Sequence, residues 1–570
     1  MSKILRVDLT SGRSEATEAN AAEARMGGRG LIAAILGAEV DPAADPLGPE
    51  NVLVLATGLL AGTSVPNSGR LSVGGKSPLT GGIKEANSGG TAARRLAGLG
   101  MKAVAFSGAA PELSLVHITS EGTDIRPAPQ LAGLGTYETT ARLREEYGER
   151  AGIVCIGPAG EMQLKAAAVI VSSPDGRPRS ASRGGLGAVM GAKNIKAVVV
   201  DDTGGPGVAV AHPEALKAAT STYSEAIRAH GFAQGLGAMG TGMLINVANS
   251  MGCLATKSYS AGSFDSAEAI SGEEMHGRMT SRPNAQTSHR CMAGCLINCS
   301  QVYTDEQGEE ITSGFEFESL TLLGANCAIS DLDQVARLDR LCDDLGLDTI
   351  ETGAALGVAM EGGMLPWGDG AAAIALLNGL PAGAANSLLI GNGCVATGQA
   401  LDVERIPAVK GQSLAAWEPR VLKGTGVTYA TSPMGADHTC GNALPSPNLP
   451  EYNPSSAEGQ AQISQFLQSF FAGIDTLGLC LFAAIPSLDD PSFQDTLAQA
   501  VTAVTGEPTG EGYLIALGAE VVRAEKAFNR AAGFTAADDR LPAFMAVEAL
   551  PPSGNVFDVS EADLDSVFAD

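Results

Sequence analysis

Over residues 1 to about 205 the apolar positions fall in short runs, separated by clusters of Gly, Pro and Ser. Short apolar or β-branched runs bounded by turn residues are typical of strands. We therefore predict strands at 1–9, 52–55, 103–106, 113–118, 152–156, 167–171 and 197–200. One helix is predicted among them at 136–147, because Thr139, Leu143 and Tyr147 recur at four-residue spacing.

From about residue 208 the pattern becomes helical. Apolar residues follow helical periodicity at 213–229, 333–345, 351–360 and 511–532, and Gly533 suits the position after a helix end. The small-residue segment 371–396 predicts closely packed helices, and 410–435 is predicted to be a loop-rich joint. With a boundary in the Gly-rich stretch 201–207, we expect an α+β chain with domains at 1–205, 206–415 and 416–570.

Composition limits the classes of function. A chain of 570 residues is long enough for two to four domains, and 45% hydrophobic with 18% charged residues is globular. The formal net charge of −26 argues against a nucleic acid or an anionic membrane as partner. The first residues form a predicted strand and not a signal peptide, and no run is long enough to cross a membrane. We expect a cytoplasmic protein without membrane insertion, whose ten cysteines are thiols or metal ligands.

The cysteine run Cys291-x3-Cys295-x3-Cys299 is the strongest chemical signal. Its spacing would place the thiols on one face of a helix, or a loop could wrap them around one cluster. Zinc sites favour C-x2-C pairs and fit less well. A fourth thiol is supplied by Cys480, which ends the hexapeptide 475–480. Five other cysteines lack such context and are predicted to be core residues: Cys155, Cys253, Cys327, Cys342 and Cys394.

Two hexapeptides about 130 residues apart share the pattern Asp-x-x-Gly-Leu-[Asp/Cys]. They are Asp343-Asp344-Leu345-Gly346-Leu347-Asp348 and Asp475-Thr476-Leu477-Gly478-Leu479-Cys480. A duplicated acidic turn suggests two copies of one ligand group. Glycine-rich segments at 66–70, 76–81, 85–90 and 183–191 could form anion nests with Arg70 and Arg183 nearby, which suggests a large phosphorylated cofactor.

These motifs resemble the tungsten- or molybdenum-dependent aldehyde ferredoxin oxidoreductases nearly from end to end. The resemblance also covers Gly27-Gly28-Arg29-Gly30-Leu31, Ile156-Gly157-Pro158-Ala159-Gly160-Glu161 and Phe528-Asn529-Arg530. It implies an N-terminal domain of two sheets that binds a bis-pyranopterin, followed by two mainly helical domains. The run C-x3-C-x3-C departs from the family's commonest C-x2-C-x3-C, which moves Cys291 by one residue.

The resemblance also implies site residues. Cys291, Cys295, Cys299 and Cys480 match the ligands of a [4Fe–4S] cluster, and Asp343 and Asp475 match two aspartates that bind pterin rings. A magnesium ion is expected to bridge the pterin phosphates. The remaining residues expected to bind the cofactor are Arg70, Asn87, Ser88, Gly89, Gly90, Arg183, Gly184, Gly185, Gly346, Leu347, Asp348, Gly478 and Leu479.

The implied reaction oxidises an aldehyde, with water, to a carboxylic acid. Glu318 is expected to be the general base, with Glu316 as the fallback, and His438 is expected to donate a hydrogen bond or move a proton. A ferredoxin or an iron–sulfur electron-transfer subunit would accept the electrons. The choice between tungsten and molybdenum stays open, and so does the oligomeric state, with a homodimer as one option.

Two other functions remain in view. One is an acid or acyl reductase subunit of the same fold, which would work with electron-transfer partner subunits. The other, from a different class, is an iron–sulfur electron carrier without its own catalysis. The length of the chain, the paired aspartates and the phosphate motifs favour an enzyme.

Overall fold

The computed structural model describes residues 2–446 and 451–569. Its N-terminal part contains two six-stranded sheets, as expected. The first has the order β2 (Arg13–Glu18), β1 (Lys3–Asp8), β6 (Met101–Ser107), β3 (Leu53–Thr57), β4 (Leu71–Lys76), β5 (Ile83–Ser88). The second has the order β11 (Pro178–Ala181), β10 (Val169–Ser172), β9 (Gly152–Cys155), β12 (Ile195–Val200), β7 (Ser114–Ile118), β8 (Thr123–Pro127).

The two sheets share one apolar core. Successive side chains of a strand point to opposite faces. Leu53 and Leu55 of β3 therefore join a cluster with Val154 and Val198 of the second sheet, whereas Val54 packs into the cluster that includes α2 (Gly28–Glu39). Every residue of β3, β9 and β12 is buried, so these strands are apolar on both faces because both faces are covered, and they appear in the sequence as short continuous apolar runs.

The rest of the chain is mainly helical, which confirms the predicted fold class. The predicted helices at 136–147 and 213–229 are α4 (Thr136–Tyr147) and α7 (Pro213–Ala229), and the other three are α12 (Leu332–Leu345), α13 (Thr349–Glu361) and α21 (Tyr513–Ala531). Further elements are α3 (Ala92–Gly98), α9 (Leu244–Met251), α10 (Gly272–Ser281), α11 (Phe317–Leu322), α14 (Gly370–Asn378), α15 (Ala385–Gly391), α16 (Gly393–Ala400), α18 (Gln460–Leu477), α19 (Leu481–Asp489) and α20 (Ser492–Thr505).

One segment differs from its prediction. The stretch 410–435, expected to be loop-rich, contains the helix α17 (Lys423–Thr431). Every residue of α17 is buried. A helix covered on all sides needs no polar face, so its sequence lacks the stripe from which helical periodicity is detected.

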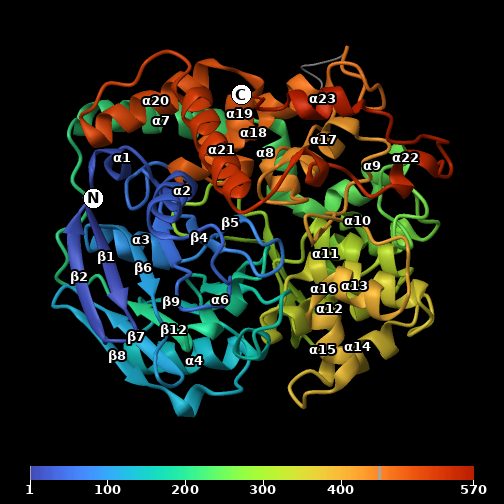
Figure 1. Ribbon diagram of the computed structural model, residues 1–570, viewed down its shortest axis with the longest axis horizontal. Helices are drawn as coiled ribbons and strands as arrows, with labels where there is room; N and C mark the ends of the chain where they lie inside the picture. The colour runs from blue at the N-terminus through green and yellow to red at the C-terminus, as the bar shows by residue number, and fades with distance from the viewer. Residues whose placement is uncertain (1, 447–450, 570) are drawn as a thin grey trace.

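The parts of the chain meet around a common centre. Figure 1 shows the two sheets on one side, α12 to α16 beside them, and the C-terminal helices α18 and α21 above. A small sheet of β13 (Gln286–His289), β14 (Ser300–Thr304) and β15 (Glu310–Ser313) frames the cysteine run. None of the helices in the described part of the chain combines the length and apolarity needed to span a bilayer.

Candidate active site

The cysteine run lies in a loop between β13 and β14, not on a helix. Cys291 and Cys299 line a cavity of about 840 Å³, together with Cys480, which precedes α19. The fourth thiol, Cys295, is buried beside them. The structure therefore brings together four cysteines that are almost 190 positions apart in the chain.

Asn67 joins the two cysteine segments. Its side-chain oxygen accepts from the Leu296 backbone N–H at 3.0 Å, and its side-chain nitrogen donates to Cys295 Sγ at 3.2 Å. Its backbone N–H donates to the Gly294 carbonyl at 3.2 Å, and its carbonyl accepts from the Cys480 N–H at 2.8 Å. Asn67 has φ of +57°, a left-handed conformation that asparagine tolerates better than most residues. In the sequence, Asn67 belongs to a Gly-rich segment that was expected to bind phosphate. Its partners lie more than 200 residues away in the chain, so the spacing of the cysteines does not reveal them.

Burial favours the protonated form of two of these thiols. Burial raises the pKa of Cys291 to about 12 and also raises that of Cys480, with further upward shifts from neighbouring thiols. Across residues 2–446 and 451–569, no three His, Cys, Asp or Glu side chains converge as ligands of a single metal ion. A zinc site would require such convergence at about 2.3 Å. The arrangement fits a larger, cationic group that bridges more distant thiols and stabilises the thiolates.

Glu318 and His438 face each other in the same cavity. Glu318 lies in the first turn of α11, where its Oε2 accepts the Ala416 backbone N–H at 2.7 Å. Its Oε1 is 3.4 Å from His438 Nε2. Within the described residues, Glu318 Oε1 and His438 Nδ1 are buried without a hydrogen-bond partner. A carboxylate held by one oxygen and free at the other is suited to accept a proton from a molecule in the cavity.

The neighbouring Glu316 points to a different part of the cavity. Its carboxyl accepts from the Thr241 hydroxyl, which itself accepts the Phe317 N–H at 2.8 Å. Burial raises the pKa of Glu316 to about 7, and its charge in turn contributes to the raised pKa of Cys299. Glu316 therefore lies on the side of the cavity that holds the thiols. Its geometry supports a role as general base less well than that of Glu318, which is paired with His438.

Both hexapeptides are helix C-termini. α12 ends at Leu345 and α18 ends at Leu477, and the following Gly346 and Gly478 adopt φ of +71° and +72°. Each turn lies against a glycine that follows a strand of one sheet. A Cβ on Gly346 would lie 2.7 Å from Gly157 N, and one on Gly478 would lie 2.8 Å from Gly58 Cα. The duplicated motif is thus a pair of equivalent docking turns, one for each sheet.

The second hexapeptide is linked to the first sheet by polar side chains. Asn87 donates to Asp475 Oδ1 at 3.0 Å, and Arg70 donates to both the side chain and the backbone carbonyl of Asn87. Arg29, which forms a buried ion pair with Glu525, lies 3.4 Å from Asp475. Burial raises the pKa of Asp475, and these arginines oppose that shift.

Asp343 lines the cavity from the other side. Burial raises the pKa of its carboxyl well above the usual range, while Arg179 and Arg340 lower it. Arg179 lines the cavity as well; it donates to Ser300 Oγ at 2.9 Å, and its Nε is buried without a partner in the described part of the chain. Arg179 was not identified from the sequence because it lies on a short strand outside any Gly-rich motif.

Only some of the residues predicted to bind the cofactor line the cavity. Arg183 is buried and donates to Asp348, to the Ser413 carbonyl and to the Ala436 carbonyl, so its guanidinium is already engaged by protein groups. Ser88 and Gly89 line the cavity, as do Arg70 and Asp343. The described lining of the cavity does not include the other residues predicted to bind the cofactor: Asn87, Gly90, Arg183, Gly184, Gly185, Gly346, Leu347, Asp348, Asp475, Gly478 and Leu479.

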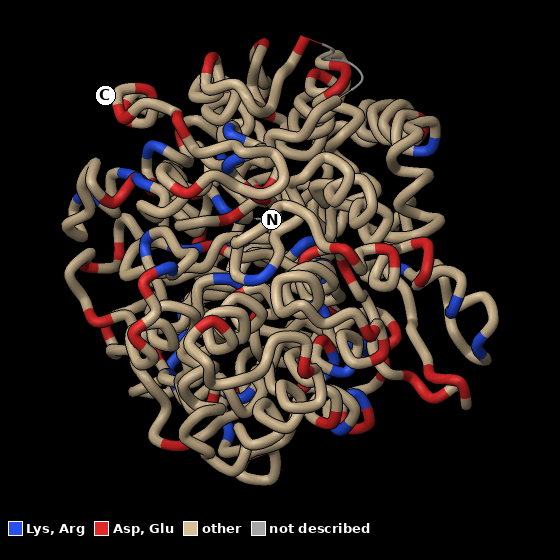
Figure 2. The backbone as a smooth tube through the Cα atoms, turned by 90° about the vertical axis from the view of Figure 1, so that its right-hand side faces the viewer, with Lys and Arg blue, Asp and Glu red and all other residues tan. Residues whose placement is uncertain are grey.

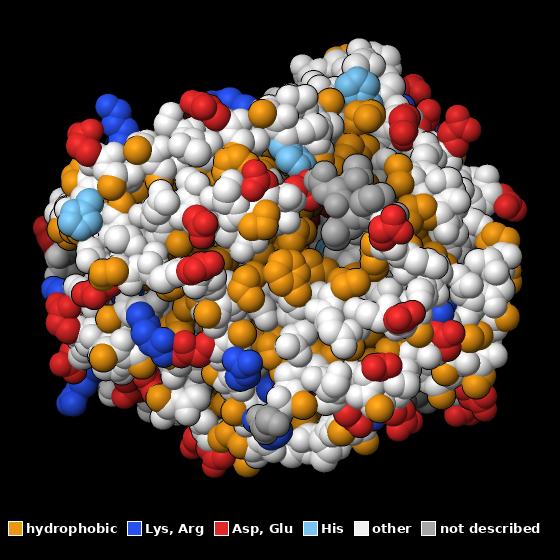
Figure 3. Space-filling view, turned by 90° about the horizontal axis from the view of Figure 1, so that it is seen from above, with side chains coloured by type: hydrophobic (Ala, Val, Ile, Leu, Met, Phe, Trp, Pro, Cys, Tyr) orange, Lys and Arg blue, Asp and Glu red, His pale blue; other side chains and the backbone are white. Residues whose placement is uncertain are grey.

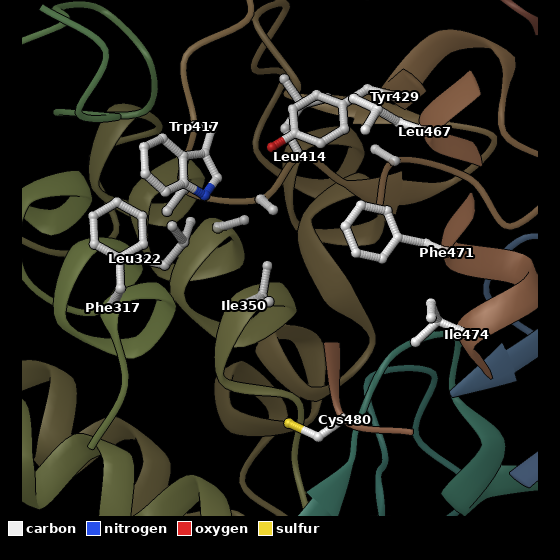
Figure 4. Close-up of a cluster of buried hydrophobic side chains, with 14 of the residues drawn as sticks. Phe317, Leu322, Ile350, Leu414, Trp417, Tyr429, Leu467, Phe471, Ile474 and Cys480 are labelled. Carbon is white, nitrogen blue, oxygen red and sulfur yellow. The ribbon is translucent and has the colours of Figure 1, made fainter. Parts of the chain in front are cut away.

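One side of the cavity is apolar. Phe317 and Trp417 lie with ring centroids 4.4 Å apart, and Figure 4 shows them across from Phe471, with Cys480 nearby. Hydrophobic side chains also gather near the middle of the face shown in Figure 3. An enclosure of this size with a few placed polar groups is typical of a small-molecule site.

The residues present fit a large polar cofactor. Among the described residues, the lining of the cavity holds five buried polar atoms without partners, on Arg179, Ser180, His230, Glu318 and His438. Buried polar atoms are normally satisfied, so a bound group with several donors and acceptors would complete this site. The two raised carboxyl pKa values are consistent with this, because ring N–H donors would stabilise the ionised aspartates.

Comparisons with known proteins identify the family of the chain. The model of the family described as "Aldehyde ferredoxin oxidoreductase, N-terminal domain" matches residues 4–202, and that described as "Aldehyde ferredoxin oxidoreductase, domains 2 & 3" matches residues 218–568. The chain is 35% identical over 579 residues to the tungsten-containing aldehyde ferredoxin oxidoreductase of Pyrococcus furiosus, which covers 97% of this chain and 92% of that protein.

More distant relatives have other descriptions. The WOR-like subunit of an aliphatic sulfonate oxidoreductase from Pyrococcus furiosus is 28% identical over 498 residues, covering 78% of this chain and 75% of that protein. A solved structure, the active site complex BamBC of benzoyl coenzyme A reductase in complex with 1,5-dienoyl-CoA, is 22% identical with a TM-score of 0.80. It covers 95% of this chain and 90% of that chain, and shows that the fold is shared.

Proposed function

Because this chain belongs to the aldehyde ferredoxin oxidoreductase family, we propose that it oxidises an aldehyde to a carboxylic acid in the cavity of about 840 Å³. The balanced reaction converts one aldehyde and one water into one carboxylic acid, two protons and two electrons. The observation that carries the proposal is the Glu318–His438 pair in the same cavity as three of the four clustered thiols.

The cofactor set is part of the proposal. A tungsten or molybdenum bis-pyranopterin would supply two-electron oxidation, a [4Fe–4S] cluster one-electron transfer, and magnesium a bridge between pterin phosphates. Asp343 and Asp475 would accept hydrogen bonds from the pterin rings, and Arg70 and Arg179 would offset negative charge. Cys291, Cys295, Cys299 and Cys480 would hold the cluster.

Glu318 would take the proton from water or from the aldehyde hydrate. The Ala416 N–H holds one carboxylate oxygen and leaves Oε1 directed toward His438. His438 would donate a hydrogen bond to the carbonyl oxygen and then pass on a proton. The apolar wall around Phe317 and Trp417 would bind the substrate's carbon chain and exclude bulk water, which strengthens these polar contacts.

Substitution Glu318→Gln tests this assignment, since the amide keeps the shape and cannot accept a proton. We expect aldehyde oxidation to fall by about 10²- to 10⁴-fold, the usual contribution of a general base. Tungsten, molybdenum, iron and pterin content, measured on the same preparation, should not change. Glu309→Gln, on an exposed turn, is the control and should retain full activity. Wild-type turnover by Glu318→Gln would disprove the base assignment.

A second substrate class is suggested by the relative described as a subunit of an aliphatic sulfonate oxidoreductase. Its lower identity, 28% against 35%, favours the aldehyde. Assays of the purified protein with aldehydes and with aliphatic sulfonates, using a dye acceptor, would separate the two. Turnover of sulfonates without turnover of aldehydes would overturn the proposal.

A further inference from the structure

A second cleft lies beside the cysteine loop and is separate from the cavity of the proposed reaction. Its volume is about 600 Å³. It is lined by Ala293, Gly294 and Leu296 of the cysteine loop, and by Gly69 and Gly90. Gly294 directly precedes the buried Cys295, and a Cβ on Gly89, next to Gly90, would lie 2.8 Å from Cys291 Sγ. The cleft is therefore lined by residues that are chain neighbours of the thiols or of a glycine in contact with one.

The charge of the cleft is opposite to that of the whole chain. The protein carries 63 acidic and 37 basic residues, and Figure 2 shows Asp and Glu distributed widely over the backbone. The described residues that line the cleft nevertheless include four arginines, Arg94, Arg95, Arg150 and Arg228, and a single acidic residue, Glu149. This is a local basic surface on a strongly acidic molecule.

Three of these arginines are uncommitted. Arg95 is paired with Asp202 at 3.2 Å and donates to the Arg150 carbonyl. Arg94 on α3, Arg150 before β9 and Arg228 at the end of α7 are exposed. Their side chains have neither a hydrogen bond nor an ion pair to any described residue. They come from three separate elements and converge on one rim, so ordinary solvation of one helix face does not explain their clustering.

We propose that this cleft is the docking surface for a small acidic electron-transfer protein, with Arg94, Arg150 and Arg228 as its recognition residues. This inference rests on the proposed function, and it names the surface through which the electrons of that reaction would leave the protein. Each aldehyde oxidised would reduce two one-electron carriers in turn. Surface arginines steer an acidic partner and fix its orientation, and the cysteine loop in the wall of the cleft would bring the carrier next to the segment that holds the thiols.

Direct binding is the first test, and it does not depend on aldehyde turnover. Holoprotein is titrated with a purified acidic [4Fe–4S] ferredoxin by calorimetry at low ionic strength. The triple variant Arg94→Glu/Arg150→Glu/Arg228→Glu is expected to bind at least about tenfold more weakly, the lower end of steering effects. Added salt should weaken wild-type binding more than variant binding, because screening acts on the removed charges. The milder Arg→Gln triple variant should lie between them.

Arg337→Glu is the matched control, since Arg337 is also exposed but lies on α12 and outside the cleft. It changes the net charge in the same direction at one residue and should leave binding within about twofold of wild type. Equal ferredoxin affinity in wild type and both triple variants would overturn the proposal. The single variants Arg94→Glu, Arg150→Glu and Arg228→Glu are measured as well. If each of them loses as much ferredoxin affinity as Arg337→Glu does, the proposal is also overturned, because only the total charge of the protein would then matter.

Kinetics separate this inference from the proposed function. The triple variant should raise KM for ferredoxin by about tenfold or more, while aldehyde oxidation with a small dye acceptor and iron content stay at wild-type values. Absence of dye-linked aldehyde oxidation in wild type would disprove the proposed reaction but leave the binding comparison decisive. If inorganic phosphate binds the cleft and ferredoxin does not compete with it, the surface is an anion site and the docking proposal is wrong.

Discussion

Single residues connect parts of the site that the chain places far apart. Asn67 is the main example, because its side chain and backbone contact both the cysteine loop and the segment of Cys480. Each of its hydrogen bonds is worth about 1 kcal/mol. More importantly, an N–H donor to a thiolate sulfur would tune the reduction potential of a cluster held by that sulfur. Asn67 thus acts through the cysteines as a positioning residue.

Substitution Asn67→Gly is expected to reduce iron content and to lower the reduction potential of the remaining cluster. Glycine keeps the φ of +57° without strain, so the effect isolates the side chain. Asn67→Ala should lose more, because alanine in the left-handed region costs a further ~1–2 kcal/mol. Iron analysis and a redox titration followed by electron paramagnetic resonance measure both changes. Full iron content with a wild-type potential in both variants would contradict the positioning role.

Glu85 gives the site a pH-dependent stability. Burial, and then the nearby Asp475 carboxyl, raise the pKa of Glu85 from 4.5 to about 8. The folded protein therefore holds a proton that the unfolded chain releases between these values, and stability falls as pH rises from about 4.5 to about 8. Glu85→Gln cannot ionise and should flatten this loss, which amounts to a few kcal/mol at about 1.4 kcal/mol per pH unit. Unfolding temperatures of both proteins from pH 5 to 9 test this; parallel curves would contradict it.

How many residues of the site can be predicted from the sequence depends on how far apart in the chain the interacting residues lie. The cysteines and the two aspartates were identifiable because their local spacing repeats. Asn67, Arg179 and Glu85 were not assigned, because their importance comes from partners hundreds of positions away and from burial. Glu318 and His438 were named through the resemblance alone; their 3.4 Å approach is a property of the folded chain.

Among elements, the duplicated hexapeptides show how a repeat in sequence serves two sheets. Each ends a helix, and each turn packs on backbone: β3 is followed by Gly58 against Gly478, and β9 by Gly157 against Gly346. In each turn, the carbonyl of the glycine accepts a hydrogen bond from a backbone N–H next to a strand. Arg70 N donates to the Gly478 carbonyl, and Ala168 N donates to the Gly346 carbonyl. Helical and strand periodicity predicted most of these elements, whereas the fully buried α17 has no such periodicity to detect.

Gly478→Ala should therefore destabilise the protein more than a Gly→Ala substitution at a helix end that has free space around it. Gly252 is a matched control, because it also follows a helix, α9, with φ of +71°, but has no atom within 4 Å of an added Cβ. Gly252→Ala should cost ~1–2 kcal/mol for the left-handed backbone alone. Gly478→Ala adds a backbone clash at 2.8 Å, so its unfolding temperature should be lower than that of Gly252→Ala. Equal unfolding temperatures would show that the close approach to Gly58 is unimportant.

At the scale of the whole molecule, the cavity is a junction between parts of the chain. Its lining includes Arg70 and Arg179 from the sheets, Glu318 and Asp343 from the central helices, and Phe471 and Cys480 from the C-terminal part. A group bound there contacts all three at once and stabilises only the folded state. The unpartnered polar atoms and the raised pKa values of Asp343 and Asp475 are a cost that binding of such a group would remove.

Protein produced without tungstate and molybdate should therefore unfold at a temperature several degrees below that of the loaded protein. A ligand at 100 times its dissociation constant adds about 2.7 kcal/mol, and a tightly held cofactor adds more. Protease sensitivity of the helical segments around Phe471 should rise in parallel, because a cofactor in the cavity would contact both these helices and the sheets. Glu318→Gln, loaded with cofactor, should match the wild-type unfolding temperature, which separates catalysis from assembly. If metal-free and loaded proteins unfold together, the cavity does not hold the group that joins these parts.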